Sequence, residues 1–240
     1  MKKAIIAVVL VAAAGVLAVR FLRSRDFLYA GTIEATEVDL SSRLTSVISA
    51  FPAKEGRTVR QGEVLVNLAC EDQKLAADIA AKDFKRAVEL RRTGSLPQES
   101  YDRTLNKRED ADLRLGWCSV ASPIDATVLA TYHEPGELVN PGTRLLTLAD
   151  LREVWALVYV PETLLYKLKP GMEVEAELPE VKRTLRGSID HINSEAEFTP
   201  KNVQTRQERT RLVFGVKVTF PNPDTLLKPG MTVEVRLPKG

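Results

Sequence analysis

The fold is decided by the stretch Gly56-Arg-Thr-Val59-Arg-Gln-Gly62-Glu-Val-Leu65-Val-Asn-Leu68-Ala69, which returns eighty residues later as Gly136-Glu-Leu-Val139-Asn-Pro-Gly142-Thr-Arg-Leu145-Leu-Thr-Leu148-Ala149. In each copy, apolar residues alternate around a glycine that tolerates positive φ. This pattern is typical of two short strands joined by a tight turn. One copy is too small to bury a core. We therefore predict that the two copies face each other in a small β-sandwich.

The duplication extends upstream of the quoted stretch. Ser46–Ala50 aligns with Ala126–Ala130 at the same offset of eighty residues. A separate strand is predicted before the first copy, over Gly31–Leu40, because polar and apolar residues alternate there. The sandwich should therefore use residues 31–70 and 118–150.

Between the two copies, residues 71–117 are polar and have a helical period. The first arm carries a broken apolar stripe of Leu75, Ile79, Val88 and Leu90, together with Ala76, Ala80 and Ala87. The second arm carries Tyr101, Leu105, Ala111 or Asp112, and Leu115. The break at Thr93–Pro97 supplies a glycine to cap the first helix and a proline to start the second. We predict an antiparallel α-helical hairpin inserted into a mainly β protein.

Composition excludes several classes of function. The chain has 240 residues and a net charge of only +2, and it carries no basic patch interleaved with aromatic residues, so nucleic acid is not an expected partner. Its two histidines, His133 and His191, lie far apart in the sequence and have no nearby cysteine. No Gly-rich phosphate loop is present. We expect a non-enzymatic protein without catalytic residues, cofactor or metal.

The N-terminus departs from the average composition. Met1-Lys2-Lys3 precedes Ala4–Val19, sixteen residues without a charge. A cleaved signal peptide and a retained membrane helix both fit this pattern. The length of the run and the weak cleavage site Val16-Leu17-Ala18 favour an anchor over residues 1–25. Under either interpretation, the rest of the chain is expected to be exported.

After residue 150 the pattern is β. A strand is predicted over Val154–Val160, and a second repeat matches Leu168–Pro179 with Leu227–Pro238 at an offset of 59 residues. Each copy of this repeat begins with a Pro-Gly turn and continues as an alternating strand. We predict a small closed barrel over residues 151–240. Its polar stretch Phe198–Arg211 is either a surface loop or a loop that contacts a partner.

These pieces resemble the HlyD-like membrane fusion proteins, the periplasmic adaptors of tripartite efflux and secretion systems. Residues 56–68 and 118–151 resemble the two halves of the family's split biotinyl/lipoyl domain. Ala121-Ser122-Pro123-Ile124-Asp125-Ala126-Thr127-Val128 resembles the family's Ala-Pro-x-Asp-Gly-x-Val run. In this run Ser122 is extra or shifted and Ala126 replaces glycine, so we expect the local turn to differ. Longer adaptors add a membrane-proximal domain, which we expect to be absent or vestigial here.

The resemblance implies functional residues at two places. At the hairpin tip, Arg86-x3-Leu90-x6-Pro97 fits the spacing of the family motif that binds a TolC-like outer-membrane channel, with Pro97 in place of serine. The other interpretation makes Arg86 a solvated residue of the arm and Leu90 part of the seam. In the barrel, one stretch resembles the loop of adaptors paired with ABC exporters: Phe198, Thr199, Pro200, Val203, Gln204, Thr205 and Arg209.

The resemblance also implies an assembly and a location. The chain would be a ring-forming homo-oligomer, a hexamer, whose lipoyl-like domains line a duct. It would be held at the inner membrane by a single helix, with the bulk of the chain in the periplasm between an ABC-type transporter and the channel. Two other functions remain open: a cell-envelope scaffold without an efflux partner, and a lipoyl or biotin carrier. The carrier is disfavoured because no modifiable lysine tip joins the two halves.

The two cysteines, Cys70 and Cys118, bracket the predicted hairpin. In an exported protein they can form a disulfide that restrains the hairpin at its base. The alternative is a pair of buried thiols. Neither cysteine has a histidine nearby in the sequence, so a catalytic thiol is not expected.

Overall fold

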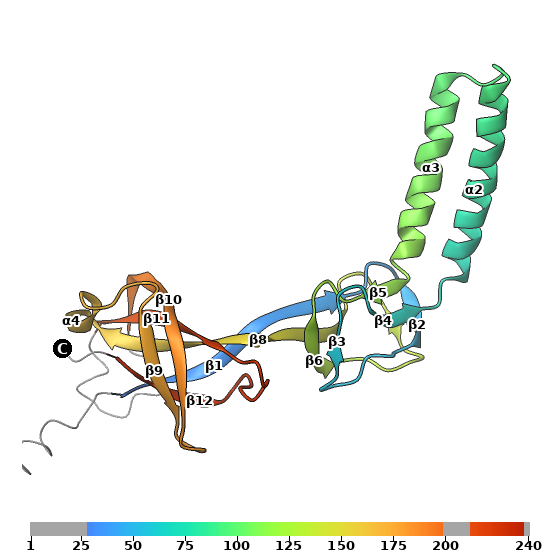
Figure 1. The fold of residues 1–240 in the computed structure, drawn as a ribbon. Helices are drawn as coiled ribbons and strands as arrows, with labels where there is room; N and C mark the ends of the chain where they lie inside the picture. Colours follow the sequence, from blue (N-terminus) through green and yellow to red (C-terminus); the bar gives the residue numbers. More distant parts are fainter. Residues whose placement is uncertain (1–27, 199–211, 238–240) are drawn as a thin grey trace, which may run out of the picture. The chain divides into compact units, whose positions relative to one another are not determined.

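The structure is a computed structural model that describes residues 28–198 and 212–237 (Figure 1). The predicted anchor over residues 1–25 and the predicted contact residues Thr199 to Arg209 lie outside the described residues. The chain divides into two compact units, one of Thr36–Leu151 and one of Met1–Ala35 with Arg152–Gly240. Within the described part, no helix is both long and apolar enough to cross a bilayer.

The fold is mainly β, as predicted, with two long helices. Its elements in chain order are β1 (Leu28–Ser41), β2 (Ser46–Ala50), β3 (Thr58–Val59), β4 (Val64–Leu68), α2 (Glu71–Arg92), α3 (Gln98–Gly116), β5 (Ser119–Ala121), β6 (Ala126–Thr131), β7 (Leu138–Val139), β8 (Arg144–Pro161), α4 (Glu162–Leu165), β9 (Glu173–Leu178), β10 (Arg183–Phe198), β11 (Leu212–Pro221) and β12 (Thr232–Arg236).

The two copies of the repeat bind each other through reciprocal backbone hydrogen bonds. The Gly56 N–H donates to the Val128 carbonyl at 2.8 Å, and the Gly136 N–H donates to the Ile48 carbonyl at 2.8 Å. Both bonds join equivalent positions, since each donor and each acceptor has its counterpart eighty residues away. Each half therefore satisfies backbone groups of the other, and the interrupted duplicate forms one β unit.

A second reciprocal pair of hydrogen bonds involves Ser42 and Ser122. The Gly62 N–H donates to the Ser122 carbonyl at 2.8 Å, and the Gly142 N–H donates to the Ser42 carbonyl at 2.9 Å. The hydroxyls of Ser42 and Ser122 each donate to the carbonyl two residues further on, at 2.7 and 2.6 Å. Ser122 is therefore the counterpart of Ser42 within this chain, and the duplication begins at least four residues earlier than the sequence pattern indicated.

The core of this unit is formed equally by both copies. Leu65 and its counterpart Leu145 are both fully buried. The buried members of the core cluster are Ile48, Ala53, Val59, Leu65, Val66, Leu68, Ala126, Val128, Val139, Leu145, Leu146 and Leu148. Since all of them come from the two halves and none from α2 or α3, the hairpin is not needed to complete this core.

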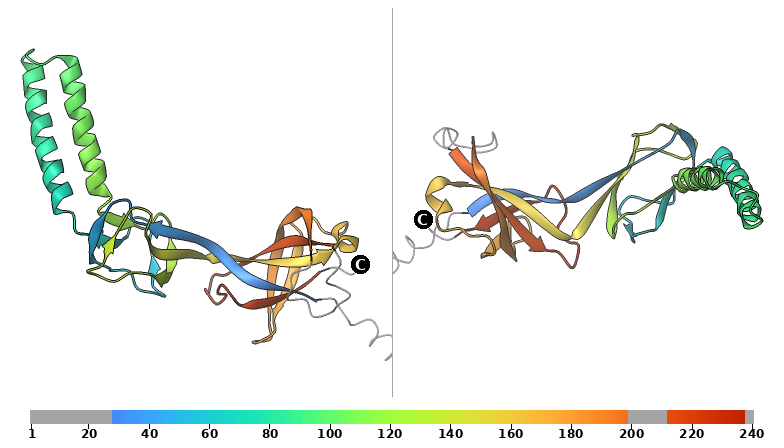
Figure 2. Two further views of the ribbon diagram at one scale, coloured as in Figure 1. Left: turned by 180° about the vertical axis from the view of Figure 1, so that it is seen from behind. Right: turned by 90° about the horizontal axis from the view of Figure 1, so that it is seen from above.

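Helices α2 and α3 pack side by side as an antiparallel hairpin (Figure 2). The first helix ends at its C-cap Thr93, and Gly94 follows with φ of 74°. Pro97 is the N-cap of α3, so the second helix begins one residue later than a proline start would place it. The predicted break is therefore the turn of the hairpin.

The predicted seam of the hairpin is confirmed for its small residues and wrong for its large apolar residues on α2. The buried residues of α2 are Ala77, Ala80 and Ala87, and the buried residue of α3 is Ala111. Four large apolar side chains expected in the seam of α2 are exposed instead: Leu75, Ile79, Val88 and Leu90. Near the base the helices therefore approach each other over alanine side chains, together with Leu115 of α3.

The second unit contains the β-barrel. Its strand order is β1-β12-β9-β10-β11-β8, and β1 also pairs with β8, so the described strands close on themselves. The two Pro-Gly turns have φ of 82° at Gly171 and 92° at Gly230. Their N–H groups donate to strand carbonyls, from Gly171 to Ile189 at 2.7 Å and from Gly230 to Ile33 at 2.9 Å. The second repeat thus closes two turns of the barrel in the same way.

The reciprocal packing predicts that equivalent substitutions act on one cooperative unit. Leu65→Ala and Leu145→Ala should each lower the free energy of unfolding of this unit by about 2–5 kcal/mol, because each leaves a cavity in the shared core. Urea unfolding followed by circular dichroism measures the change. Leu138→Ala, at a side chain that is 62% exposed, is the matched control and should change it by less than about 0.5 kcal/mol. Two separate transitions, each sensitive to one substitution, would contradict a single unit.

Candidate functional site

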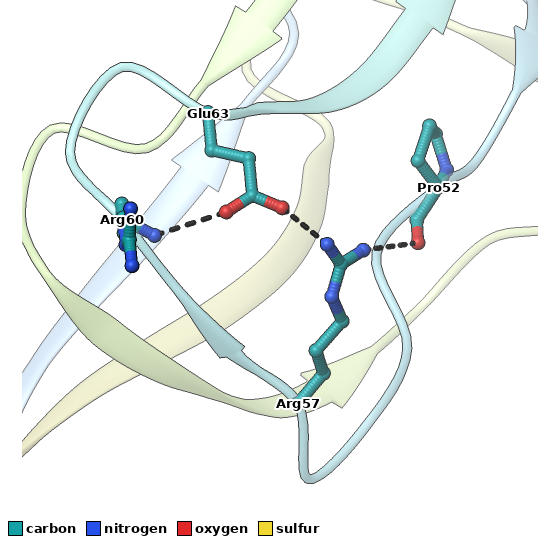
Figure 3. A network of polar contacts seen from close by, with 4 residues as sticks. All are labelled: Pro52, Arg57, Arg60 and Glu63. Atoms are coloured by element: carbon teal, nitrogen blue, oxygen red, sulfur yellow. Dashed lines mark hydrogen bonds and ion pairs between the residues drawn. The ribbon is translucent and has the colours of Figure 1, made fainter.

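The β unit presents rigid turns. Between β3 and β4, the Arg57 guanidinium lies 2.5 Å from Glu63 Oε1 and donates to the Pro52 carbonyl at 3.3 Å (Figure 3). The Arg60 N–H donates to Glu63 Oε2 at 3.1 Å. In the second copy Thr143 occupies the position of Glu63, and its hydroxyl accepts the equivalent N–H at 3.2 Å. The exposed Arg57–Glu63 ion pair contributes at most about 1 kcal/mol to the stability of the fold, so its role is to fix the turn.

A disulfide joins the two ends of the hairpin. Cys70 and Cys118 are bonded, with their Cα atoms 6.0 Å apart and a sequence separation of 48. Cys70 is the N-cap residue of α2 and makes no side-chain capping hydrogen bond. Beside the bond, the Leu68 N–H donates to the Cys118 carbonyl at 2.8 Å, which ties the base of the hairpin to β4. The base is therefore held covalently and by the sheet.

Above the base, the seam of the hairpin changes character. Nearest the base it is a small cluster of Ala77, Ala80 and Ala111 with Leu115. Further out, the rings of Phe84 and Tyr101 lie 5.5 Å apart. The guanidinium of Arg108 lies 4.4 Å from the centre of the Phe84 ring, and that of Arg91 lies 4.3 Å from the centre of the Tyr101 ring. Such pairs contribute only about 0.5–1.5 kcal/mol each.

Sequence reasoning missed Phe84, Arg91 and Arg108. A signal for them was present, because residues 73, 77, 80, 84, 87 and 91 are spaced alternately by four and three, as in a coiled-coil seam. One glutamine, three alanines and one arginine at these positions hide the signal, since only Phe84 is a large apolar residue. A search for spacing alone, without regard to hydrophobicity, would have found it.

The predicted tip residues lie on the outer half of the hairpin. Arg86 and Leu90 lie one turn apart on α2, and both are exposed. Arg86 forms an ion pair with Asp83 on the same helix. Pro97 is exposed at the start of α3, across the turn. The three residues thus occupy one end of the hairpin, and among the described residues no side-chain hydrogen bond or ion pair joins Pro97 to the other two.

The structure describes only some residues of the other predicted sites. Phe198 is the last residue of β10 and lies opposite Leu212 of β11, so the predicted loop connects these two strands. Among residues 28–198 and 212–237, no group of three or more His, Cys, Asp or Glu residues is placed to hold a metal ion. His133 lies 2.5 Å from Glu137, four residues away in the same turn.

Several solved structures have the same arrangement of a β unit, a helical hairpin and a β-barrel, and they define the fold class of this chain. A chimera of MacA with the α-hairpin domain of Pseudomonas aeruginosa MexA has a TM-score of 0.71 at 19% identity, over 88% of this chain and 80% of that chain. The membrane fusion protein Spr0693 of Streptococcus pneumoniae has a TM-score of 0.66 at 16% identity, over 89% of this chain and 99% of that chain. This chain has the fold of the membrane fusion proteins.

Sequence relatives agree with this class. Residues 153–240 match the family described as the CusB-like β-barrel domain. A UPF0194 membrane protein of Acidithiobacillus ferridurans is 38% identical over 136 residues, which are 56% of this chain and 39% of that protein. Another from Enterobacter sp. strain 638 is 28% identical over 193 residues, which are 78% of this chain and 57% of that protein. The chain thus spans about half the length of these relatives.

The disulfide generates a prediction about the hairpin. Under denaturing, non-reducing conditions the protein should show no free thiol, and reduction should release two. Replacing both cysteines by serine should lower hydrogen-exchange protection of α2 and α3, because the chain-entropy contribution of the bond is on the order of 4 kcal/mol.

Amides of β4 and β6 in the same sample are the internal control and should keep their protection. Reduced and alkylated wild-type protein should match the double variant. Two thiols in the unreduced protein would show that the cysteines are not paired.

Proposed function

We propose that the chain is the adaptor of a tripartite efflux or secretion system, linking an inner-membrane transporter to a TolC-like outer-membrane channel. The observation that carries the proposal is the hairpin, whose base is fixed to the β unit by the Cys70–Cys118 bond and whose tip is exposed. The hairpin adds nothing to the core of that unit. A helical pair that completes no core and is anchored at one end is suited to reach a partner.

The channel contact is assigned to Arg86, Leu90 and Pro97. Arg86 and Leu90 share one face of α2, so a single groove on a partner can receive both. Leu90 is 48% exposed, and an apolar side chain at this position is costly to leave in water unless something covers it. Pro97 in place of the family's serine removes a hydroxyl, and the contact at this position would then depend on shape and apolar surface.

The transporter contact is assigned to the barrel. Phe198, Thr199, Pro200, Val203, Gln204, Thr205 and Arg209 form the connection after β10 that resembles the loop of adaptors paired with ABC exporters. The resemblance of this loop is what makes an ABC-type transporter the proposed partner. Energy would come from that partner, and the adaptor itself is proposed to be non-enzymatic, without cofactor or metal.

The assembly is proposed to be a homo-oligomeric ring of six copies at the inner membrane, with the bulk of each chain in the periplasm. The apolar run Ala4–Val19 would anchor each copy. The lipoyl-like units would line the duct. Since the hairpin joins the two halves of the repeat, the segment where a carrier would present its modified lysine is occupied by helices, which favours an adaptor over a carrier.

Crosslinking in cells tests the proposal. A photoreactive residue at position 97 should capture an outer-membrane channel. Arg86→Glu and Leu90→Ser should each reduce that capture about tenfold, the effect of losing roughly 1.4 kcal/mol of binding.

The matched control is Leu113→Ser, because Leu113 is an exposed apolar residue of the same hairpin near its base. It should leave the capture unchanged. Capture of only lipid, or of no protein other than the chain itself, would leave the scaffold interpretation and exclude the adaptor.

A further inference from the structure

One end of the β-barrel gathers the start of β1, the end of β8 and α4. β8 ends at Pro161, which is the N-cap of α4 and lies opposite Val213 of β11. β1 pairs with β8 and runs in the opposite direction (Figure 1). A Cβ added at Gly31 would lie 2.9 Å from the Leu157 carbonyl oxygen. Leu28 is therefore level with the last residues of β8, and we call this part of the barrel the α4 end.

The α4 end presents an aromatic side chain to solvent. Leu164 and Leu168 are 7% and 5% exposed, whereas Tyr166, two residues from each, is 80% exposed. Helical spacing places the two leucines on one side of the chain and Tyr166 on the other. The N–H groups of Lys167 and Leu168 donate to the carbonyls of Leu164 and Leu165, at 3.0 and 3.1 Å. Tyr166 is therefore held outward by a hydrogen-bonded turn whose flanking leucines are buried.

Other exposed side chains lie at the same end. Leu212, the first residue of β11, is 52% exposed, and Leu28, the first residue of β1, is 36% exposed. α4 packs against β11. Lys169, which follows α4, is exposed, and so is Glu162 at the start of α4. We call Leu28, Tyr166, Lys169 and Leu212 the barrel-end patch. Tyrosine, leucine and a lysine side by side are the residue types that suit a membrane–water interface.

The sequence before β1 indicates what covers this patch. Ala4–Val19 is apolar and uncharged, and eight residues, 20–27, separate it from Leu28. Eight residues span at most about 30 Å when fully extended. With Ala4–Val19 in the bilayer, as proposed above, the start of β1 lies within about this distance of the membrane surface. The connecting residues include three arginines and one aspartate, a basic balance that favours anionic lipid headgroups.

We propose that the barrel-end patch contacts the surface of the bilayer in which the same chain is anchored. The ring of Tyr166 lies at headgroup level, where amphipathic aromatic side chains are favoured. Leu28 and Leu212 cover the apolar boundary beside it, and Lys169 approaches lipid phosphates. The contact rests on the proposed anchor and goes beyond it, because it assigns a lipid contact to the folded barrel. A second attachment restricts the orientations that a single helix and a connecting segment would allow.

A fluorescence reporter tests the contact with the full-length chain in vesicles of phosphatidylethanolamine and phosphatidylglycerol. Brominated acyl chains quench tryptophan that lies against them. Tyr166→Trp should add fluorescence that brominated lipid lowers at least about twofold, compared with the same lipid without bromine. The wild type, with Trp117 and Trp155, gives the background.

The matched control is Leu226→Trp. Leu226 is an apolar residue, 40% exposed, in the connection that follows β11 at the end of that strand remote from α4. Its added fluorescence should be the same in both lipids. Circular dichroism checks that each variant is folded. Equal quenching at the two positions, or none at position 166, would overturn the proposal.

The lysine of the patch has a control in the second repeat. Lys169 and Lys228 occupy equivalent positions before the two Pro-Gly turns, and both are exposed. Lys169→Glu should lower the quenching of tryptophan at position 166 by about half in vesicles that contain phosphatidylglycerol. It should have no effect in phosphatidylcholine vesicles, and Lys228→Glu should have none in either. An equal effect of the two substitutions would overturn the assignment of Lys169.

Hydroxyl-radical oxidation tests the protein without substitutions. Tyr166 is 80% exposed and Tyr132 is 47% exposed, so Tyr166 should be oxidised faster if only the chain itself covers it. In vesicles the order should reverse, with Tyr166 oxidised at least about threefold more slowly than Tyr132, as measured by mass spectrometry. Faster oxidation of Tyr166 in the vesicle-bound chain would overturn the proposal and leave this surface to a protein partner.

The outcomes separate this contact from the rest of the proposed function. A chain that does not stay with the vesicles would overturn both the contact and the proposed anchor. A chain that stays with them while Tyr166 is neither quenched as tryptophan nor protected from oxidation would overturn the contact alone. Because no channel or transporter is present, failure of channel capture in cells is a separate result.

Discussion

The reciprocal hydrogen bonding between the two copies of the repeat is the constraint on which the rest of the structure depends. The N–H of Gly56 is satisfied by the second half, and the N–H of Gly136 is satisfied by the first half. Each of these bonds contributes on the order of 1 kcal/mol, and the two halves also share one buried core, so each half depends on the other for its stability. Residues 70 and 118 must therefore lie close together, and any segment between them must leave and return at the same place. An antiparallel helical pair satisfies this condition.

Once its ends are fixed, the hairpin needs little stabilisation from packing between its own two helices. Alanine side chains bury little apolar area, and the outer half relies on Phe84, Tyr101 and two guanidinium groups stacked on their rings. The disulfide compensates for this thin seam by limiting the conformations of the unfolded segment. The larger aliphatic side chains are thereby released from the seam and become available to other molecules.

The sequence was sufficient to predict the architecture, but it was not sufficient to predict which side chains of the hairpin are buried and which are exposed. The offset of eighty residues and the Pro-Gly repeat predicted the β unit and the barrel, because turns that require positive φ restrict the residues that can occupy them. The seam could not be predicted from hydrophobicity, since Ala80 is buried while Leu75 is exposed. Which face of a polar helix is covered depends on its neighbour, and the neighbour's position follows from the fold. The equivalence of Ser42 and Ser122 was missed for a related reason, because Ser42 lies outside the run of matching residues.

One face of α2 changes its chemistry along its length. Arg86 and Leu90 continue the face that begins with Leu75, because all of these residues recur at helical spacing. Near the base this face is aliphatic, with Leu75 and Ile79 both exposed. Near the tip it carries Arg86, whose guanidinium forms an ion pair with Asp83 of the same helix. The two ends of the hairpin therefore present different chemistry on one continuous face, although the thin seam is common to both.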